Sequence, residues 1–379
     1  MVCRAHYRPI LSCAVILATR LATLYTHAYM TRTYFKTAKR RREAREDNEA
    51  WPGGPERRLY ANLGGVGFKT GSIAKDLQER GLVEHSSAPI EEILHTRRKV
   101  YVGVDPTADS LHVGHLAWIL LMKRLGEAGN ALHFLVGGGT GLIGDPKEKG
   151  ERPMLDARTV AANARALKKQ LKGILGRTRF TMLDNADWLT SIKLIPFLRD
   201  IGKHFSVNEL IKRDLIRNRL ETPNESISYT EFTYSLLQGY DFLTLYKTRG
   251  VSLQIGGSDQ WTNILSGVEL IRKHLGKQAY ALSIPLVMDA AGKKLGKSEG
   301  NAVWLNPKKT SPFAFYQYWM RLPDDTLERF LMVYTFIPIA DIRALMVRHR
   351  EAPHQRVHRH AHRALVFGEC FGDQSHGGG

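Results

Sequence analysis

The sequence predicts an α/β fold, in which a doubly wound parallel sheet with helices on both faces is followed by a small all-α domain. Between residues 99 and 287, short apolar runs alternate with longer amphipathic stretches, which is typical of parallel strands joined by helices. After residue 310 only helical patterns remain. The 379 residues, 43% of them apolar, suffice for a buried core and two or three domains, and they exclude a disordered or collagen-like chain.

The individual strands and helices can be assigned in order. Residues 99–104 and 132–136 are apolar runs of strand length, and 114–128 between them has helical spacing that ends at Gly129. Asp156 can cap a helix that runs to about 175. The other elements expected from the same patterns are a strand at 179–183, helices at 186–200, 206–219 and 230–247, a strand at 251–255, a helix at 259–275 and a strand at 283–287.

The basic charge of the chain has two parts. Residues 1–42 contain nine lysines and arginines and no acidic residue, so they carry half of the formal net charge of +18. Their longest uncharged run is too short to cross a bilayer, and arginines continue beyond it. This pattern favours a mitochondrial transit peptide over a secretory signal or a disordered basic tail. Only Cys370 would remain after cleavage, which excludes an intramolecular disulfide and a cysteine-rich zinc site.

A glycine-rich segment follows the strand expected at 132–136. Residues 139–144 (GTGLIG) fit the dinucleotide fingerprint G-x-G-x-x-G. Asp145, Pro146 and a run of charged residues come next, where a dinucleotide site needs an apolar helix. We therefore reject an NAD-dependent enzyme and expect a loop that lets a ligand approach the backbone closely.

Two further motifs carry groups that could meet phosphates. His112 and His115 begin the helix at 114–128 and can face one point, either as helix-capping groups or as two imidazole donors. No nearby residues complete a zinc ligand set. The segment 292–300 (GKKLGKSEG) is a cationic turn that does not fit the phosphate loop of nucleoside triphosphatases.

A polar stripe crosses an otherwise apolar helix. Tyr234, Gln238 and Asp241 are spaced at i, i+4 and i+7 and therefore share one face of the helix at 230–247. Buried polar groups are costly unless they are satisfied. Either a network closed within the protein or a bound ligand can satisfy them.

At this point the sequence resembles the tyrosyl-tRNA synthetases of the bacterial and mitochondrial type, which are class I aminoacyl-tRNA synthetases. The resemblance covers about 99 to 335 and includes the HIGH-like and KMSKS-like signatures of that class. The motifs that carry it are HVGH (112–115), VGGGTGLIGDP (136–146), GKHFSVN (202–208), YTEFTYSLLQGYDF (229–242), LQIGGSDQW (253–261) and KLGKS (294–298). The resemblance implies a Rossmann-like catalytic domain, and a homodimer that uses tyrosine, tRNA(Tyr), and ATP with Mg²⁺.

The resemblance also implies a role for particular residues. Groups at the reacting phosphates would be His112, His115, Thr107, Lys294, Lys297, Ser298, Lys149 (or Lys147) and Arg152. The tyrosine site would consist of Tyr101 and Asp241 at the phenol hydroxyl, Asp145, Tyr234 and Gln238 at the amino group, and Asp105, Gln260 and Asn208. ATP would also contact Gly103, Gly114, Gly256, Gly257 and Asp259. Two departures, Val102 and Trp118, are expected to alter ATP affinity more than the reaction.

The expected domain organisation follows from the resemblance. A transit peptide (1–42) and an N-terminal helical extension (43–98) precede the catalytic domain (99–300), which carries an inserted helical segment near 185–225. Residues 301–379 would form a linker and a shortened anticodon-binding domain, with no S4-like domain. We thus expect a tyrosine–tRNA ligase of the mitochondrial matrix, without a membrane partner. The alternative is a factor that binds group I intron RNA in splicing, and both activities are compatible with the charge.

Overall fold

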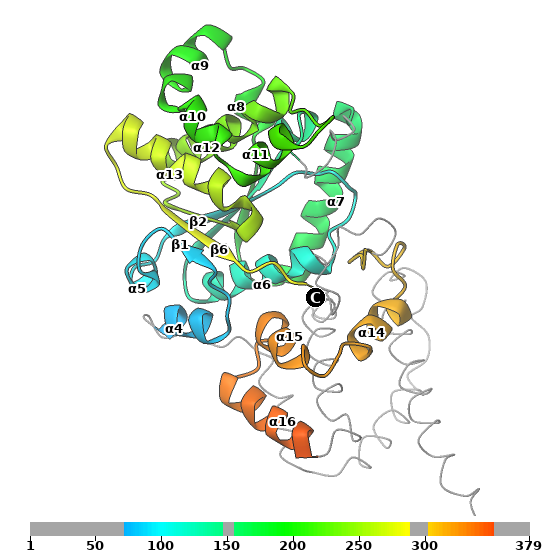
Figure 1. Ribbon diagram of the computed structural model, residues 1–379. Coiled ribbons are helices and arrows are strands. Elements are labelled where there is room, and N and C mark those ends of the chain that lie inside the picture. The colour runs from blue at the N-terminus through cyan, green and yellow to red at the C-terminus, as the bar shows by residue number, and fades with distance from the viewer. Residues whose placement is uncertain (1–71, 147–154, 289–301, 352–379) are drawn as a thin grey trace, which may run out of the picture. The chain divides into compact units, whose positions relative to one another are not determined.

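The computed structural model describes residues 72–146, 155–288 and 302–351 (Figure 1). The expected transit peptide, Lys149, Arg152 and the cationic segment at 292–300 lie outside these ranges. The chain divides into two compact units. One includes residues 67–306 with 332–334 and contains the sheet, and the other includes 307–331 and the residues from 335 onward. In the part of the second unit that the structure describes, the regular elements are helices.

A six-stranded sheet with the order β1-β6-β5-β2-β3-β4 organises the first unit. Five strands run parallel, and the short β1 pairs antiparallel with β6. The strands are β1 (His85–Ser86), β2 (Lys99–Val104), β3 (Ala131–Val136), β4 (Phe180–Asp184), β5 (Leu253–Gly257) and β6 (Tyr280–Ile284). From β2 the chain builds outward through β3 to β4 and then returns to the other side of β2 with β5. The strand order therefore reverses between β2 and β5, where α/β proteins bind their ligands.

Helices connect the strands and cover the sheet (Figure 1). Helix α6 packs against β3 and β5, whereas α12 and α13 pack against each other and α13 lies against β5 and β6. The longer helices of this unit are α4 (Ser72–Glu79), α6 (Val113–Glu127), α7 (Ala157–Leu175), α11 (Asp214–Glu221), α12 (Tyr229–Arg249) and α13 (Trp261–Leu275). The shorter ones are α5 (Ile90–Leu94), α8 (Ala186–Leu189), α9 (Leu194–Asp200) and α10 (Val207–Ile211). Helices α14 (Pro312–Met320), α15 (Leu327–Tyr334) and α16 (Ile339–Glu351) follow the sheet.

The predicted α/β class is confirmed, and local sequence explains most of the helix boundaries. Asp156 caps α7 as expected, because its Oδ1 accepts hydrogen bonds from the amides of Arg158 and Thr159 at 2.9 and 3.0 Å. Ser228 caps α12 together with Glu231, and Gly250 ends that helix in the left-handed conformation at φ 69°.

Two predicted helices were wrong in their continuity. The helix expected at 186–200 is divided into α8 and α9, because Pro196 fits only the first turn of a helix. The helix expected at 206–219 is divided into α10 and α11 by Arg213, whose backbone is extended at ψ 131°. The strand expected at 283–287 lies earlier, at β6, because Pro285 cannot donate to the sheet.

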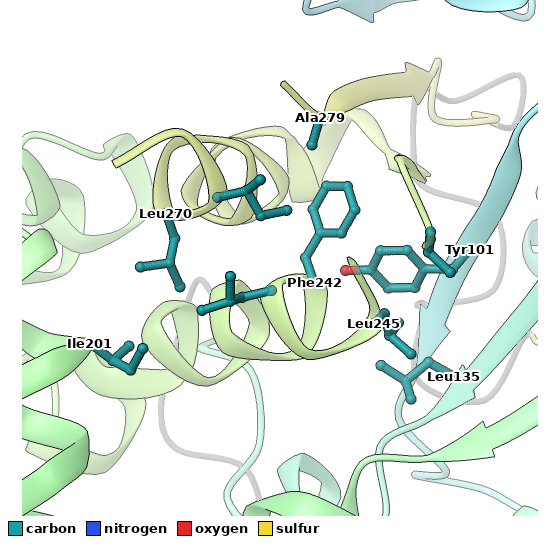
Figure 2. Packing of buried hydrophobic residues seen from close by; sticks show 10 residues of the cluster. Tyr101, Leu135, Ile201, Phe242, Leu245, Leu270 and Ala279 are labelled. Carbon is teal, nitrogen blue, oxygen red and sulfur yellow. The ribbon is translucent and has the colours of Figure 1, made fainter. Parts of the chain in front are cut away.

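The apolar core on one face of the sheet includes a tyrosine from the central strand. Tyr101 on β2 is buried and its ring centroid lies 5.1 Å from that of Phe242 on α12 (Figure 2). Leu270 on α13 and Ala279 beside β6 belong to the same cluster. Among the described residues, no helix is both long and apolar enough to span a membrane.

Candidate active site

A cavity of about 390 Å³ opens at the carboxyl ends of the parallel strands, at the reversal between β2 and β5. Asp105 follows β2 directly, Gly137 follows β3, and Gly256 and Gly257 end β5. The walls combine backbone-exposing glycines with carboxylates, histidines and tyrosines. This is the position that the topology favours for a ligand, and the lining has the mixed character of a binding site.

Two histidines lie at the start of α6. His112 is the N-cap, and its backbone amide donates to Nδ1 of His115 at 3.2 Å. The two imidazole rings are stacked with centroids 3.6 Å apart. Because Nδ1 of His115 accepts this bond, a neutral His115 ring carries its proton on Nε2 and is a donor there. The cavity therefore contains helix N-terminal amides and imidazole donors, which suit an anion.

Asp105 is held in place by two hydroxyl groups. Its Oδ1 accepts from Oγ1 of Thr140 at 2.7 Å and its Oδ2 accepts from the hydroxyl of Tyr234 at 2.8 Å. Burial, together with the neighbouring carboxylates, raises the pKa of Tyr234 well above its ordinary value, so this hydroxyl remains a donor. Gly137 is required beside this group, because a Cβ there would lie 1.9 Å from Oδ1 of Asp105.

Asp241 is a buried carboxylate at the Tyr101 end of the cavity. Its Oδ1 accepts from Nε1 of Trp188 at 2.7 Å and its Oδ2 accepts from Nδ2 of Asn185 at 2.9 Å. Burial raises the pKa of Asp241 to about 7, although both hydrogen bonds act in the opposite direction. The hydroxyl of Tyr101 is buried and has no hydrogen-bond partner among the described residues. Burial and, to a smaller extent, the negative charge of Asp241 raise the pKa of Tyr101 well above its ordinary value. A ligand hydroxyl between these two groups would supply the missing partner.

A third carboxylate, Asp145, lies in the cavity wall and accepts hydrogen bonds from two side-chain amides. Nε2 of Gln260 donates to its Oδ2 at 2.8 Å, and Nδ2 of Asn263 donates to its Oδ1 at 3.2 Å. The two amide bonds orient this carboxylate, which lines the cavity and has the chemistry that suits a ligand cation.

The structure brings the sequence-predicted residues together, with one exception. Every predicted residue that lies in the described ranges lines the cavity except Asn208, which is exposed on α10. Those that line it are Tyr101, Gly103, Asp105, Thr107, His112, Gly114, His115, Asp145, Tyr234, Gln238, Asp241, Gly256, Gly257, Asp259 and Gln260. The departures Val102 and Trp118 line it as well. The predicted lysines, Arg152 and Ser298 lie outside the described residues.

Sequence reasoning missed several polar residues that hold the site. Asn185, Trp188 and Asn263 each donate to a cavity carboxylate. Gln254 on β5 lines the cavity, and its buried Oε1 has no hydrogen-bond partner among the described residues. Asn185 directly follows β4, and a polar residue after a parallel strand is a signal that could have identified it. Gln254 stands in the motif LQIGGSDQW (253–261), whereas Trp188 and Asn263 stand in none of the motifs that carry the family resemblance.

The loop with the dinucleotide-like motif adopts a different structure from a dinucleotide site. Residues Thr140–Leu142 form a single 3-10 turn after β3, and Gly144 has φ 88°. The next described helix is α7, which starts at Ala157. Asp145 and Pro146, the described residues directly after the motif, are not helical, whereas a dinucleotide site continues from its motif into the helix that binds the pyrophosphate.

Comparisons with known proteins agree on the family of this chain. Residues 94–369 match the model for class I tRNA synthetases of the W and Y type. A tyrosine–tRNA ligase from Streptococcus gordonii is 46% identical over 293 residues, which are 75% of this chain and 69% of the relative. The C-terminally truncated mitochondrial tyrosyl-tRNA synthetase of Aspergillus nidulans has a TM-score of 0.71 at 30% identity, covering 79% of this chain and 90% of that one. The C-terminally truncated mitochondrial tyrosyl-tRNA synthetase of Coccidioides posadasii has a TM-score of 0.69 at 28% identity, covering 89% of this chain and 97% of that one. This chain therefore belongs to the tyrosyl-tRNA synthetases, within class I of the aminoacyl-tRNA synthetases.

Proposed function

We propose that this protein is a mitochondrial tyrosine–tRNA ligase. It activates tyrosine with ATP to tyrosyl-adenylate, releases pyrophosphate and passes the tyrosyl group to tRNA(Tyr). The observation that carries the amino-acid specificity is that a buried carboxylate, Asp241, and the buried hydroxyl-bearing side chain of Tyr101 line the same cavity.

The phenol hydroxyl of tyrosine is the group that this end of the cavity accommodates. It would donate to Asp241 and accept from Tyr101, whose own hydroxyl has no hydrogen-bond partner among the described residues. Phenylalanine would leave the Tyr101 hydroxyl buried without a hydrogen-bond partner and would bring no donor to Asp241, which is the general reason why a site built to bind a hydroxyl rejects the analogue that lacks it. The same reasoning separates this site from that of a tryptophanyl enzyme, which needs no such pair.

The α-ammonium group of tyrosine would lie at Asp145. This carboxylate offers the negative charge that an ammonium requires, and Tyr234 and Gln238 of α12 line the same cavity. Asp105 is turned toward Tyr234 and Thr140 by its two hydrogen bonds, so it positions Tyr234. The carboxylate of the bound tyrosine would then point toward the start of α6.

The histidine end of the cavity would bind ATP. The tyrosine carboxylate itself attacks the α-phosphate, so the reaction needs no protein nucleophile. It depends instead on positioning and on donors that meet the charge of the transition state. His112 and His115 would supply such donors, with Thr107 beside them, while Gly256, Gly257 and Asp259 would contact the nucleotide and Gln260 would lie near the α-phosphate. ATP would carry Mg²⁺ on its phosphates. Lys149, Arg152, Lys294, Lys297 and Ser298 would approach the pyrophosphate, as the resemblance implies.

Tyrosine-dependent exchange of labelled pyrophosphate into ATP tests the proposal. The wild-type protein should catalyse this exchange when tyrosine is present, and Asp241→Ala should lose the tyrosine-dependent exchange. Asp187→Ala on α8 is the matched control, because Asp187 is exposed and outside the cavity lining. Exchange that stays at background with saturating substrates would refute the proposal.

The proposed location rests on the acid-free leader and on the likeness to the two fungal mitochondrial enzymes. A fluorescent fusion of residues 1–42 should enter the mitochondrial matrix, and a fusion in which the arginines of the leader are replaced by glutamines should remain outside it. Equal distribution of the two fusions would contradict this location.

A homodimer is proposed from exposed apolar side chains in the segment after β4. Leu194 and Ile195 on α9 are 67% and 71% exposed, and Val207 on α10 is 56% exposed. Adjacent large apolar side chains in water are typical of a protein–protein interface. Light scattering should give twice the chain mass for the wild type and the chain mass for Ile195→Asp. The exposed Phe313→Asp is the control outside this segment, and a monomeric wild type would contradict the dimer.

The alternative activity, binding to group I intron RNA, rests on the net charge. Titration against an intron and an unrelated structured RNA at several salt concentrations would test it, because charge alone gives binding without preference. Equal affinities would remove this alternative.

A further inference from the structure

Arg213 lies in the inserted segment, at the junction of α10 and α11, and it is connected to the candidate active site through side chains. Its Nη1 donates to Oδ1 of Asn263 at 3.2 Å, and its Nη2 donates to Oγ of Ser266 at 2.5 Å. Both acceptors belong to α13, and Ser266 in turn donates to the carbonyl of Thr262. The break between α10 and α11 is the local structure that places Arg213 there, since its backbone is extended as the N-cap of α11.

The chain of hydrogen bonds from Arg213 to Asp145 has only one possible direction. A guanidinium can only donate, so the Asn263 atom that faces Arg213 must be the carbonyl oxygen. The amide nitrogen of Asn263 must then face the other way, where it donates to Oδ1 of Asp145 at 3.2 Å and contacts Oε1 of Gln260 at 3.3 Å. Because Oε1 of Gln260 faces the amide nitrogen of Asn263, Nε2 of Gln260 points the other way and donates to Oδ2 of Asp145 at 2.8 Å.

The two ends of this chain have complementary chemistry. Burial lowers the pKa of Arg213 to about 10, which leaves the group cationic at neutral pH and able to donate. Asp145 is an acceptor at the other end. Without Arg213, the Asn263 amide could rotate and turn its carbonyl oxygen toward the Asp145 carboxylate, a repulsive arrangement that would disturb both oxygens.

We propose that Arg213 is a positioning residue for the α-ammonium group of tyrosine, acting through Asn263 and Gln260 on Asp145. This inference rests on the proposed function and adds to it a role for the inserted segment. It assigns to Arg213 an effect on one end of the amino acid, whereas a purely structural role would affect every ligand of the cavity equally.

Equilibrium binding of two ligands separates these cases. Tyrosine and its analogue without the amino group, 3-(4-hydroxyphenyl)propanoate, are titrated by fluorescence against the wild type, Arg213→Met and Arg213→Lys. The methionine variant keeps the side-chain length and removes the donors. We expect Arg213→Met to raise the Kd of tyrosine about tenfold, the scale of one lost charge-assisted bond, and to change the Kd of the analogue less than about twofold. Arg213→Lys should lie between wild type and Arg213→Met, because it keeps the charge and loses the planar fork.

The control is Arg217→Met on α11. Arg217 pairs with Asp214 at the surface at 2.6 Å and is exposed, so its loss should change neither Kd. Asn263→Ala and the double variant Arg213→Met/Asn263→Ala complete a double-mutant cycle. The double variant should bind tyrosine with the Kd of whichever single variant has the higher Kd, because both substitutions interrupt the same chain of hydrogen bonds.

Each result has a defined meaning. A loss that is equal for tyrosine and the analogue, an unchanged Kd for tyrosine, or additive effects in the double variant would overturn the role of Arg213 and leave the proposed function intact. A wild-type protein that binds neither ligand would overturn both. Selective loss of tyrosine in Arg213→Met, with the analogue retained, supports the proposal.

Discussion

Removal of the Tyr101 hydroxyl should stabilise the free protein and weaken the binding of tyrosine. The hydroxyl is buried, has no hydrogen-bond partner among the described residues, and lies on β2 in the core cluster of Figure 2. A buried polar group without a partner costs about 1–3 kcal/mol in the folded state. Tyr101→Phe recovers that cost while keeping the ring against Phe242, whose centroid is 5.1 Å away.

The expected thermal shift follows from this free energy. In a unit of this size, each 1 kcal/mol of stability raises Tm by about 2–4 °C. Tyr101→Phe should therefore unfold about 2–12 °C above wild type without ligand. In the complex, the same hydroxyl contributes about 0.5–1.5 kcal/mol to a hydrogen bond with the phenol, so the Kd of tyrosine should rise roughly 2- to 12-fold. Discrimination against phenylalanine in pyrophosphate exchange should fall by a similar factor.

The control for this prediction is a buried tyrosine with a satisfied hydroxyl. Tyr280 on β6 donates to Oε1 of Glu92 at 3.2 Å and lies outside the cavity lining. Tyr280→Phe should lower Tm or leave it unchanged, and it should not affect tyrosine discrimination. A lower Tm for Tyr101→Phe, or an unchanged preference for tyrosine over phenylalanine, would refute the reasoning.

Three further predictions follow from the site. Folding raises the pKa of Asp241 from 3.8 to about 7, so the unfolding free energy of the wild type falls as the pH rises between these values. Asp241→Asn has no such group, so its unfolding free energy should rise relative to that of the wild type by up to about 4 kcal/mol across this pH range and then stay constant. Parallel thermal-unfolding profiles from pH 4 to 8 would contradict this. His115→Ala should lower kcat for pyrophosphate exchange about 100- to 1000-fold with little change in the Kd of tyrosine, and a large change in that Kd would show that His115 acts on the amino acid. Gly137→Ala should lower the unfolding free energy by about 1–3 kcal/mol, because its Cβ would lie 1.9 Å from Oδ1 of Asp105. The control is Gly173→Ala on α7, where a Cβ would have no atom within 4 Å and should raise the unfolding free energy by up to about 1 kcal/mol. Equal urea midpoints for the two variants would disprove the crowding at Gly137.

Much of the sheet could be predicted from sequence, because buried parallel strands are short apolar runs with polar or glycine residues at their ends. The residues that line the cavity were predictable for the same reason, together with the family resemblance, since Asp105 and Gly257 stand where strands end. The segment between β4 and α12 was harder to predict. Its helices are short, and their boundaries depend on Pro196 and on the tertiary hydrogen bonds of Arg213 rather than on hydrophobic periodicity.

Several side chains that hydrogen-bond to the cavity carboxylates, or hold the groups that do, come from the segment between β4 and α12. Many of the residues proposed to contact the substrates stand instead in the motifs at the ends of the strands. Asn185 and Trp188 come from the segment that begins after β4, and they satisfy Asp241 on α12. Arg213 comes from the same segment between β4 and α12 and reaches Asp145 through Asn263 on α13. Such residues need only present a donor at the right place, so they form no short motif. Since both carboxylates accept hydrogen bonds from this segment, directly or through α13, the segment that carries the proposed dimer surface also holds the two carboxylates that we propose for tyrosine binding. A change in the dimer interface should therefore alter tyrosine affinity before it alters ATP affinity.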